Sequence, residues 1–479
     1  MAPPPLTVRN LTSSPIELKL IERYAAPGSQ ESGGFSHFTR NFTTLVTNST
    51  TAPQLAENAE SFAHQDVSIL IEPLATQSTD IQMSERSPGE ILRLTFEHDG
   101  QRYRIDTPTP SAASQILTPL SPDPKQQYTA VFLPAHSFLA LYSSANLHCW
   151  MKELSDSTPL SGISIPGTHN SPTHHKALPS VRCQAVSPKE QLENGVRFFD
   201  IRVQPESPED PSKDGLVLVH GVFPISLTGP KYFRKLVNDV RDFLDRNPSE
   251  TVIMSVKREG PGNATDQQLS LILREHYTAG QTQHWFSQPR VPQLGEARGK
   301  IVLLRRFALH ERLATGDYSW DGKGWCLNGE NWAYNTPNDT HGDVCVQDFC
   351  EVLETENIDK KIGFCCDHFE RAGAAVCPIP GITTDSVNPV PPGPLFLNFL
   401  SASNFWKVGC WPEKIAAKLN PAVVEFLCMK HDAKAGGAEG DGGVGIVVCD
   451  WVGKDGDWDL IRCIVGMNAR LEMREKGMN

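Results

Sequence analysis

The sequence predicts an α/β fold, an irregular (β/α)8 barrel of the TIM type, preceded by a smaller all-β, sandwich-like domain. Three observations lead to this prediction. The chain has 479 residues, which is too long for one ordinary domain. Short runs that alternate apolar and polar residues fill the first 145 positions, whereas β-branched apolar runs alternate with helical stretches from about residue 150 onward. We therefore divide the chain into domains at 1–145 and 146–479.

Composition narrows the class of protein. Hydrophobic residues make up 39% of the chain and charged residues 21%, as in globular domains. The formal net charge of −12 argues against general nucleic-acid binding. The N-terminus lacks the basic and apolar regions of a signal peptide, and no apolar run is long enough for a transmembrane helix. We expect a cytoplasmic or peripheral membrane protein, with secretion by another route, protein partners and oligomeric state left open.

The N-terminal domain is expected to form antiparallel strands of a small sandwich, because its runs are short and separated by Pro, Ser, Asn and Gly. Residues 25–60 are rich in Ser, Thr, Gly and Asn and are expected to be a long loop. No catalytic set of side chains stands out, so the expected role is binding or packing. The expected strands are 6–11, 16–20, 67–71, 91–96, 103–105 and 127–133.

The second domain alternates strands with helices, as a barrel requires. Residues 210–215 are too few for a helix between the second and third strands, so we expect an irregular barrel there. Ser187, followed by Pro188 and Glu190, has the pattern of a helix N-terminus. The expected strands are 162–165, 196–203, 216–219, 251–256, 300–304, 343–346, 395–399 and 445–449, and the expected helices are 230–246, 266–277, 351–372, 412–431 and 460–474.

Polar and charged residues recur at the ends of these strands. Active sites of such barrels form at the C-terminal ends of the strands, from several strands at once. A single charged residue at a strand end is commonly solvated or paired, but a whole set of them at one edge indicates a site. In strand order the set comprises His169, Asp200 with Arg202, His220, Lys257 with Glu259, Arg305 with Arg306, Gln347 with Asp348, Asn398 and Asp450.

The residue types in this set suit cleavage of a phosphodiester. One histidine can take a proton from an attacking hydroxyl while a second gives a proton to the leaving oxygen. A carboxylate behind the base fixes its tautomer, as in catalytic triads. An arginine offers planar, bidentate donors to phosphate oxygens and can stabilise charge in place of a metal. No serine or thiol nucleophile is evident.

Five motifs, in order, resemble the X domain of phosphatidylinositol-specific phospholipase C, with the closer similarity to the bacterial type. The resemblance covers about residues 150–470, is strongest in the first half, and leaves an extra N-terminal domain outside it. The motifs are IPGTHNS at 165–171, GVRFFDIR at 195–202, LVHG at 218–221, VIMSVK at 252–257 and GIVVCD at 445–450.

The resemblance implies roles for the catalytic candidates. His169 would be the base that acts on the inositol 2-hydroxyl, with Asp450 as its partner. His220 would be the acid for the diacylglycerol oxygen. Arg202 would bind the phosphate, oriented by Asp200. The implied products are diacylglycerol and inositol 1,2-cyclic phosphate, from a phosphoinositide or GPI-type lipid at a membrane surface.

The same resemblance places Lys257, Arg306 and Asp348 in the inositol pocket, and we add Asn170 and Asn398 to these substrate-binding candidates. Two positions depart from the bacterial pattern. Asn170 stands where an aspartate is usual, as in the calcium-dependent type, and Cys350 stands where a tyrosine would stack on the inositol ring.

We predict no cofactor and no metal, because Arg202 would place positive charge where a cation should bind. Three alternatives stay open: a calcium-dependent phosphodiesterase, one with a different headgroup, and an inactive phosphoinositide-binding protein. Two further sets of residues are left undecided. The aromatic residues Trp320, Trp325, Trp332 and Tyr334 would either enter a membrane interface or cover the barrel, and the disulfide state of the cysteines between Cys345 and Cys377 is open.

Overall fold

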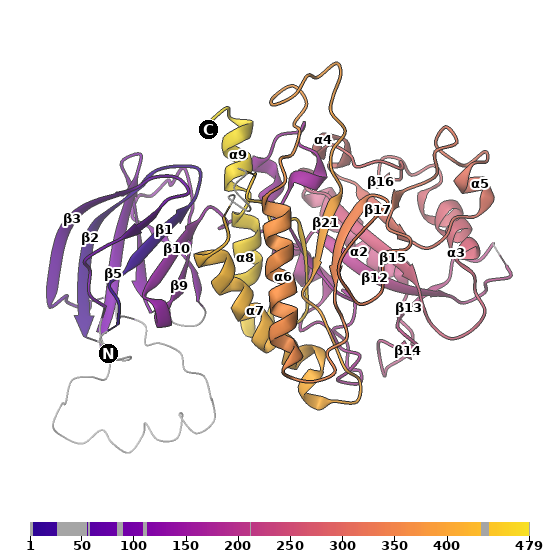
Figure 1. Cartoon of the computed structure of the whole chain (residues 1–479), viewed down its shortest axis with the longest axis horizontal. Coiled ribbons are helices and arrows are strands. Elements are labelled where there is room, and N and C mark those ends of the chain that lie inside the picture. The colour runs from indigo at the N-terminus through magenta and orange to yellow at the C-terminus, as the bar shows by residue number, and fades with distance from the viewer. Residues whose placement is uncertain are drawn as a thin grey trace. The chain divides into compact units, whose positions relative to one another are not determined.

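The computed structural model describes residues 3–25, 55, 58–83, 90–108, 113–210, 212–432 and 440–478. The chain divides into two compact units, Met1–Ala145 and Asn146–Asn479 (Figure 1). Nearly all of the loop expected at 25–60 lies outside the described residues. In the part of the chain that is described, no helix is both long and apolar enough to cross a bilayer.

The described residues of the first unit form two five-stranded sheets, in the orders β4-β1-β10-β9-β7 and β3-β2-β5-β6-β8. Its first and last strands pair in parallel, whereas the sequence led us to expect antiparallel strands. Val8 and Leu139 of one sheet and Leu18 and Leu94 of the other belong to a single buried core. The strands are β1 (Thr7–Leu11), β2 (Ile16–Ala25), β3 (Ala63–Ile71), β4 (Thr76–Ser78), β5 (Glu90–His98), β6 (Gln101–Thr107), β7 (Ser114–Ile116), β8 (Thr118–Pro119), β9 (Thr129–Leu133) and β10 (Phe138–Tyr142).

The second unit is built on a twelve-stranded sheet. Its main path runs β16-β17-β15-β12-β11-β22-β21-β20-β19, and β13, β14 and β18 lie off this path. The strands are β11 (Ile165–Thr168), β12 (Phe198–Pro205), β13 (Leu216–His220), β14 (Phe223–Pro224), β15 (Val252–Arg258), β16 (Trp285–Phe286), β17 (Ile301–Arg306), β18 (Leu327–Asn328), β19 (Thr336–His341), β20 (Val344–Asp348), β21 (Leu395–Phe399) and β22 (Ile446–Cys449).

Helices alternate with these strands, and α6, α7 and α8 lie side by side (Figure 1). The predicted helix start at Ser187 is confirmed, because its hydroxyl accepts a hydrogen bond from Glu190 N at 3.3 Å. The helix expected at 460–474 is divided into two. The helices are α1 (Pro188–Glu193), α2 (Phe233–Arg246), α3 (Asp266–Leu273), α4 (Leu294–Ala297), α5 (Glu311–Ala314), α6 (Asn357–Gly373), α7 (Pro412–Met429), α8 (Asp459–Gly466) and α9 (Ala469–Glu475).

The sheet is more open than the irregular (β/α)8 barrel that the sequence predicts. Seven consecutive strands of the main path pair in parallel with their neighbours: β17, β15, β12, β11, β22, β21 and β20. The third expected strand, β13, instead pairs antiparallel with β12, because the connection is too short for a crossover helix. No ladder between the described strands joins the two ends of the path. The result is an open sheet.

The first strand also begins later than expected. Pro166 and Gly167 lie inside β11 rather than ending it, and the Pro166 carbonyl accepts a hydrogen bond from Arg197 N at 2.8 Å. A side chain at Gly167 would bring a Cβ to 3.0 Å from Phe198 Cβ, so glycine permits the close approach of β11 and β12. His169 still follows the strand directly, as predicted.

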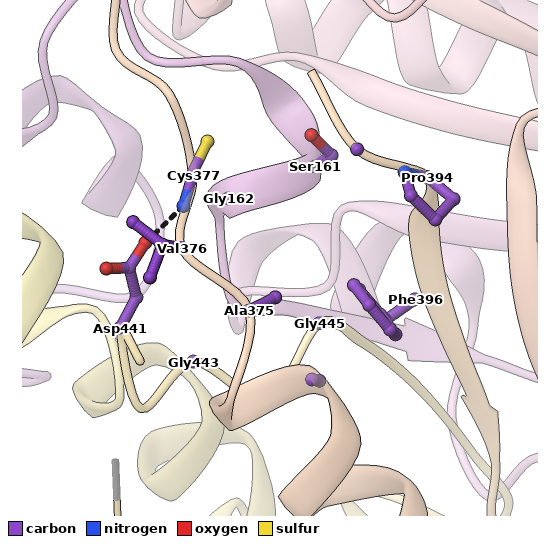
Figure 2. Close-up of a pocket in the computed structure, with 12 residues that line it drawn as sticks. Ser161, Gly162, Ala375, Val376, Cys377, Pro394, Phe396, Asp441, Gly443 and Gly445 are labelled. Atoms are coloured by element: carbon purple, nitrogen blue, oxygen red, sulfur yellow. Dashed lines mark hydrogen bonds between the residues drawn. The ribbon is translucent and has the colours of Figure 1, made fainter. Parts of the chain in front are cut away.

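A hollow of about 400 Å³ lies at the N-terminal ends of β11, β21 and β22. Cys377, Phe396 and Asp441 are among its lining residues, and Cys377 N donates to Asp441 Oδ2 at 2.7 Å (Figure 2). Burial raises the pKa of the Cys377 thiol to about 12. The hollow is therefore at the end of the strands that usually serves stability, and it offers no reactive thiolate.

The base of β12 holds a fully buried ion pair between Arg197 Nε and Glu250 Oε2, 2.9 Å apart. We expect Glu250→Ala to lower the free energy of unfolding by about 3–5 kcal/mol, because it leaves a buried guanidinium without its counter-charge. Urea denaturation would measure the change. Asp239→Ala removes the half-buried partner of the exposed Lys235 and should cost less than about 1 kcal/mol. Equal losses in the two variants would contradict the expectation.

Candidate active site

The register of three neighbouring strands brings the central side chains together. Thr168, the last residue of β11, is paired with Phe199 of β12 on one side and with Cys449 of β22 on the other. The next residues along each strand are His169, Asp200 and Asp450. Because the three strands are parallel, these residues lie side by side at the carboxyl edge of the sheet.

His169 is held through both its side chain and its backbone. Its Nδ1 donates to Asp450 Oδ1 at 2.9 Å, and its amide donates to the Cys449 carbonyl at 2.9 Å. Gln184 Nε2 donates to the His169 and Cys449 carbonyls, at 2.6 and 3.0 Å. Burial is the largest single influence and lowers the pKa of His169, but Asp450 and Cys183, through their charges and hydrogen bonds, together outweigh burial and raise the pKa well above its ordinary value. The dyad thus stabilises the imidazolium that forms when His169 accepts a proton.

His220 faces His169, with the two ring centroids 6.1 Å apart and the ring planes at 88°. Its Nδ1 donates to the Val181 carbonyl at 2.8 Å, which fixes the ring and leaves Nε2 without a bond to backbone. Burial lowers the pKa of His220, but the neighbouring Cys183 raises it, and the net shift is upward. Asn170 Nδ2 lies 3.1 Å from His169 Nε2. The two imidazoles therefore flank one space.

Arg202 lies in a network of buried charges beside the histidines. Its guanidinium donates to Asp200 Oδ2 at 2.8 Å and to Glu259 Oε1 at 3.2 Å. Lys257 Nζ lies 3.1 Å from Glu259, and Arg306 Nη1 lies 3.7 Å from Asp200. Burial alone would raise the pKa of both carboxyls, but Arg202 lowers them, that of Glu259 to about 2. Both carboxylates stay ionised and hold Arg202 in place.

Arg306 and Asp348 are joined by a tryptophan. The Arg306 guanidinium lies 3.5 Å from the centroid of the Trp332 ring, and Trp332 Nε1 donates to Asp348 Oδ2 at 3.1 Å. Burial, followed by the charge of Arg202, lowers the pKa of Arg306 to about 10. Trp332 therefore belongs to the wall of the site.

Burial answers the open question about the aromatic residues after β17 for two of the four. Trp325 and Trp332 are buried, so neither can enter a membrane interface. Trp320 and Tyr334 are exposed, and the Tyr334 hydroxyl donates to Glu351 at 2.8 Å. The loop covers the sheet with two of its aromatic side chains and exposes the other two.

Asn398 is the one substrate-binding candidate that the structure places elsewhere. It is fully buried, its Oδ1 accepts from Gln347 Nε2 at 2.8 Å and its Nδ2 donates to the Cys365 carbonyl at 2.9 Å. Gln347 in turn accepts a hydrogen bond from the buried Lys361 Nζ at 3.0 Å. Both polar atoms of the Asn398 amide thus bond within an internal network, and its expected role in substrate binding stays a prediction.

Sequence reasoning missed two residues of the site, Cys183 and Gln184, and placed Glu259 at a strand end without giving it a role. Cys183 and Gln184 come from an irregular segment between β11 and α1, where no periodic pattern points to a buried position. Glu259 follows β15, and its position two residues after Lys257 was a usable signal. Its Oε2 also accepts a hydrogen bond from Gly221 N at 2.9 Å, which ties the residue after His220 to the charge network.

The donor set does not fit calcium. Ca²⁺ takes six to eight oxygen ligands. Asp200, the carboxylate beside Asn170, already forms ion pairs with Arg202 and Arg306. The guanidinium of Arg202 supplies the positive charge at this position. Phosphate oxygens, which accept bidentate hydrogen bonds from arginine, match the arrangement.

Comparisons with known proteins agree with this chemistry. Residues 156–307 match the family model described as phosphatidylinositol-specific phospholipase C, X domain. A 1-phosphatidylinositol phosphodiesterase of Listeria monocytogenes is 34% identical over 166 residues, which cover 32% of this chain and 47% of that protein. A protein of the same name from Staphylococcus aureus is 30% identical over 203 residues, covering 40% and 59%. The chain thus spans about half the length of these relatives.

A solved structure extends the likeness to the fold. A double mutant of the phosphatidylinositol-specific phospholipase C from S. aureus superposes with a TM-score of 0.51 at 23% identity, covering 68% of this chain and 97% of the other. The family match covers the segment that carries both histidines, Arg202 and Asp200. Residues 156–307 are thus similar to the X domain of phosphatidylinositol-specific phospholipase C, and the solved structure shows a similar fold.

Proposed function

We propose that the second unit is a phosphodiesterase that cleaves phosphatidylinositol-type lipids to diacylglycerol and inositol 1,2-cyclic phosphate. The observation that carries the proposal is the placement of His169, backed by Asp450, opposite His220, with Arg202 fixed beside them. The names of the matched relatives support the same activity. The reaction needs a base, an acid and a phosphate-binding cation, and this set supplies all three.

In the proposed reaction, His169 Nε2 takes the proton of the inositol 2-hydroxyl. The hydroxyl oxygen forms a bond to phosphorus, and the bond from phosphorus to the diacylglycerol oxygen breaks. His220 Nε2 gives its proton to that leaving oxygen. Asp450 stabilises the imidazolium that forms at His169, and Arg202 binds the phosphate oxygens, whose charge grows in the transition state. Every charge that the step requires comes from side chains, so no metal takes part.

We assign recognition of the headgroup to Lys257, Arg306 and Asp348, which border the same space as Arg202. Burial, and then the charge of Arg202, lowers the pKa of Lys257. Charged donors and acceptors at fixed positions suit a polyhydroxylated ring. Cys350 has no stacking surface, so we expect the ring to be held by hydrogen bonds on this side.

An exposed aromatic group next to the site suits a lipid surface. Phe223, which follows His220 closely, stacks on Phe405 with ring centroids 5.3 Å apart, and Phe405 contacts Trp406 at 4.9 Å. Trp406 is 89% exposed and follows the carboxyl end of β21. Amphipathic aromatic rings partition into membrane interfaces. We place the contact with the bilayer here, instead of on the tryptophans after β17.

Removing either histidine should stop the reaction. We expect His169→Ala and His220→Ala each to reduce release of cyclic inositol phosphate from labelled phosphatidylinositol vesicles by about 10²–10⁴-fold, the usual contribution of acid–base catalysis. His175→Ala, in the nearby loop, is the matched control and should retain activity. Full activity in either of the first two variants would refute the mechanism, and no cyclic product from the wild type would favour a binding protein.

Glu259 should act as a positioning residue, through Arg202. We expect Glu259→Gln to lower kcat about tenfold or more with a smaller change in KM, because a charge-assisted hydrogen bond of about 1.5–3 kcal/mol is lost. Glu259→Asp, which restores the charge, should recover part of the rate. Steady-state kinetics on mixed micelles would separate kcat from KM. An unchanged kcat in Glu259→Gln would show that Arg202 does not depend on this carboxylate.

Binding to the membrane should depend on Trp406. We expect Trp406→Ala to weaken partitioning onto vesicles of phosphatidylcholine and phosphatidylinositol by about tenfold or more, because the indole no longer buries apolar area in the interface. Sedimentation with vesicles measures the partitioning. Val387→Ala, an exposed apolar residue in the segment before β21, is the control and should bind like the wild type. Equal partitioning of all three proteins would remove the assignment.

A further inference from the structure

Cys183 is a thiol inside the site that the proposed reaction does not use. It is fully buried, and its backbone is fixed at both ends: its amide donates to Thr173 Oγ1 at 3.1 Å and its carbonyl accepts from Trp451 N at 2.8 Å. Its Sγ lies 3.8 Å from His220 Nδ1. The thiol is therefore held between the segments that follow β11 and β22, against both imidazoles.

Three different metal-binding side chains meet at this point. His169, Cys183 and Asp450 each offer one donor atom, and these atoms all lie within 4.8 Å of one another. In a tetrahedral zinc site, bond lengths of about 2.0–2.3 Å place the donors about 3.3–3.8 Å apart, so shifts of about 1 Å would close the site. Among the described residues, this is the group of His, Cys, Asp and Glu donors that is close enough to hold an ion.

A second observation comes from Asn170. Its carboxamide is buried, its Nδ2 lies 3.1 Å from His169 Nε2, and its Oδ1 is a buried oxygen that has no hydrogen-bond partner within the described part of the chain. A buried oxygen without a hydrogen-bond partner thus lies on the residue that follows His169 and contacts its ring. The cluster is thus more than one isolated cysteine.

We propose that His169, Cys183 and Asp450 form a binding site for Zn²⁺, and that the bound ion blocks the active site. Thiolate, imidazole and carboxylate are the ligands that zinc prefers, and three protein ligands leave a fourth position open, as in accessible zinc sites. The ion would occupy the imidazole lone pair and the carboxylate on which the proposed base depends. Inhibition rests on the proposed function, whereas the metal site does not.

Cobalt provides a test that needs no activity. Metal-free full-length protein is titrated with Co²⁺, and the near-ultraviolet thiolate-to-cobalt band and the visible bands of tetrahedral Co²⁺ are recorded. The wild type should show both at one equivalent and lose them when Zn²⁺ displaces the cobalt. Cys183→Ser should lack the thiolate band and bind Zn²⁺ at least tenfold more weakly by competition with a chelator. Cys183→Ala is a second variant without the thiol, in case the serine variant does not fold. Circular dichroism shows whether each variant is folded.

Cys449→Ser is the matched control. Its thiol is also buried and adjoins Asp450 in sequence, but it donates to the Val447 carbonyl at 3.5 Å, so this variant should keep the cobalt spectrum. Three results would overturn the proposal. The wild type could lack the thiolate band, a Cys183→Ser or folded Cys183→Ala protein could keep the band, or a folded Cys449→Ser protein could lose the band.

The activity assay adds a separate arm. Zn²⁺ should inhibit vesicle cleavage by the wild type, and Cys183→Ser should need at least tenfold more Zn²⁺ for the same fractional inhibition, each protein being compared with its own metal-free rate. Failure of the wild type to cleave lipid would count against the proposed function alone, since the cobalt spectra decide the metal site. Equal inhibition of both active proteins would overturn the inhibitory role.

Discussion

The site depends on the register of β11 between β12 and β22. Pairing of Thr168 with both Phe199 and Cys449 aligns His169, Asp200 and Asp450 on one edge, and a shift of one residue would turn each side chain to the other face of the sheet. Gly167 makes this pairing close, because a Cβ there would press on Phe198. Gly167 thus permits the close spacing of His169 and the carboxylates that follow the two neighbouring strands.

Burial gives these aligned groups their chemical character. Asp200 and Asp450 are both buried, and a cationic or protonatable group adjoins each: Arg202 for the first and His169 for the second. Burial raises the pKa of Asp450 and His169 opposes that shift, whereas the pKa of Asp200 is lowered despite burial, mainly by Arg202. The partnership acts in both directions, since Asp450 raises the pKa of His169 and Asp200 fixes the guanidinium of Arg202. Charges arranged before substrate arrives need little reorganisation in the transition state, which is the main source of electrostatic catalysis.

The sequence was informative where a side chain follows a buried strand directly. His169, Asp200 and Asp450 could be found in this way because strand ends are marked by apolar runs and parallel strands share an edge. It was less informative where position depends on tertiary packing. Asn398 lies in a strand, yet its amide bonds to Gln347 and to the Cys365 carbonyl. Trp332 comes from a loop whose composition resembles an exposed one. β13 was recognised as a strand, but its antiparallel direction follows from the short connection to β12.

The position of Cys183 also depends on tertiary packing and could not be found from the sequence. It has a consequence for the selectivity of the site among cations. Arg202 already occupies the position beside Asp200, so a hard cation that needs several oxygens meets a fixed positive charge there. At His169 the neighbouring atoms are a sulfur, a nitrogen and one carboxylate, which favour a softer ion. Arg202 would therefore make the site independent of calcium, whereas His169, Cys183 and Asp450 would make it sensitive to zinc. Replacing Cys183 should change the sensitivity to zinc without changing the independence of calcium.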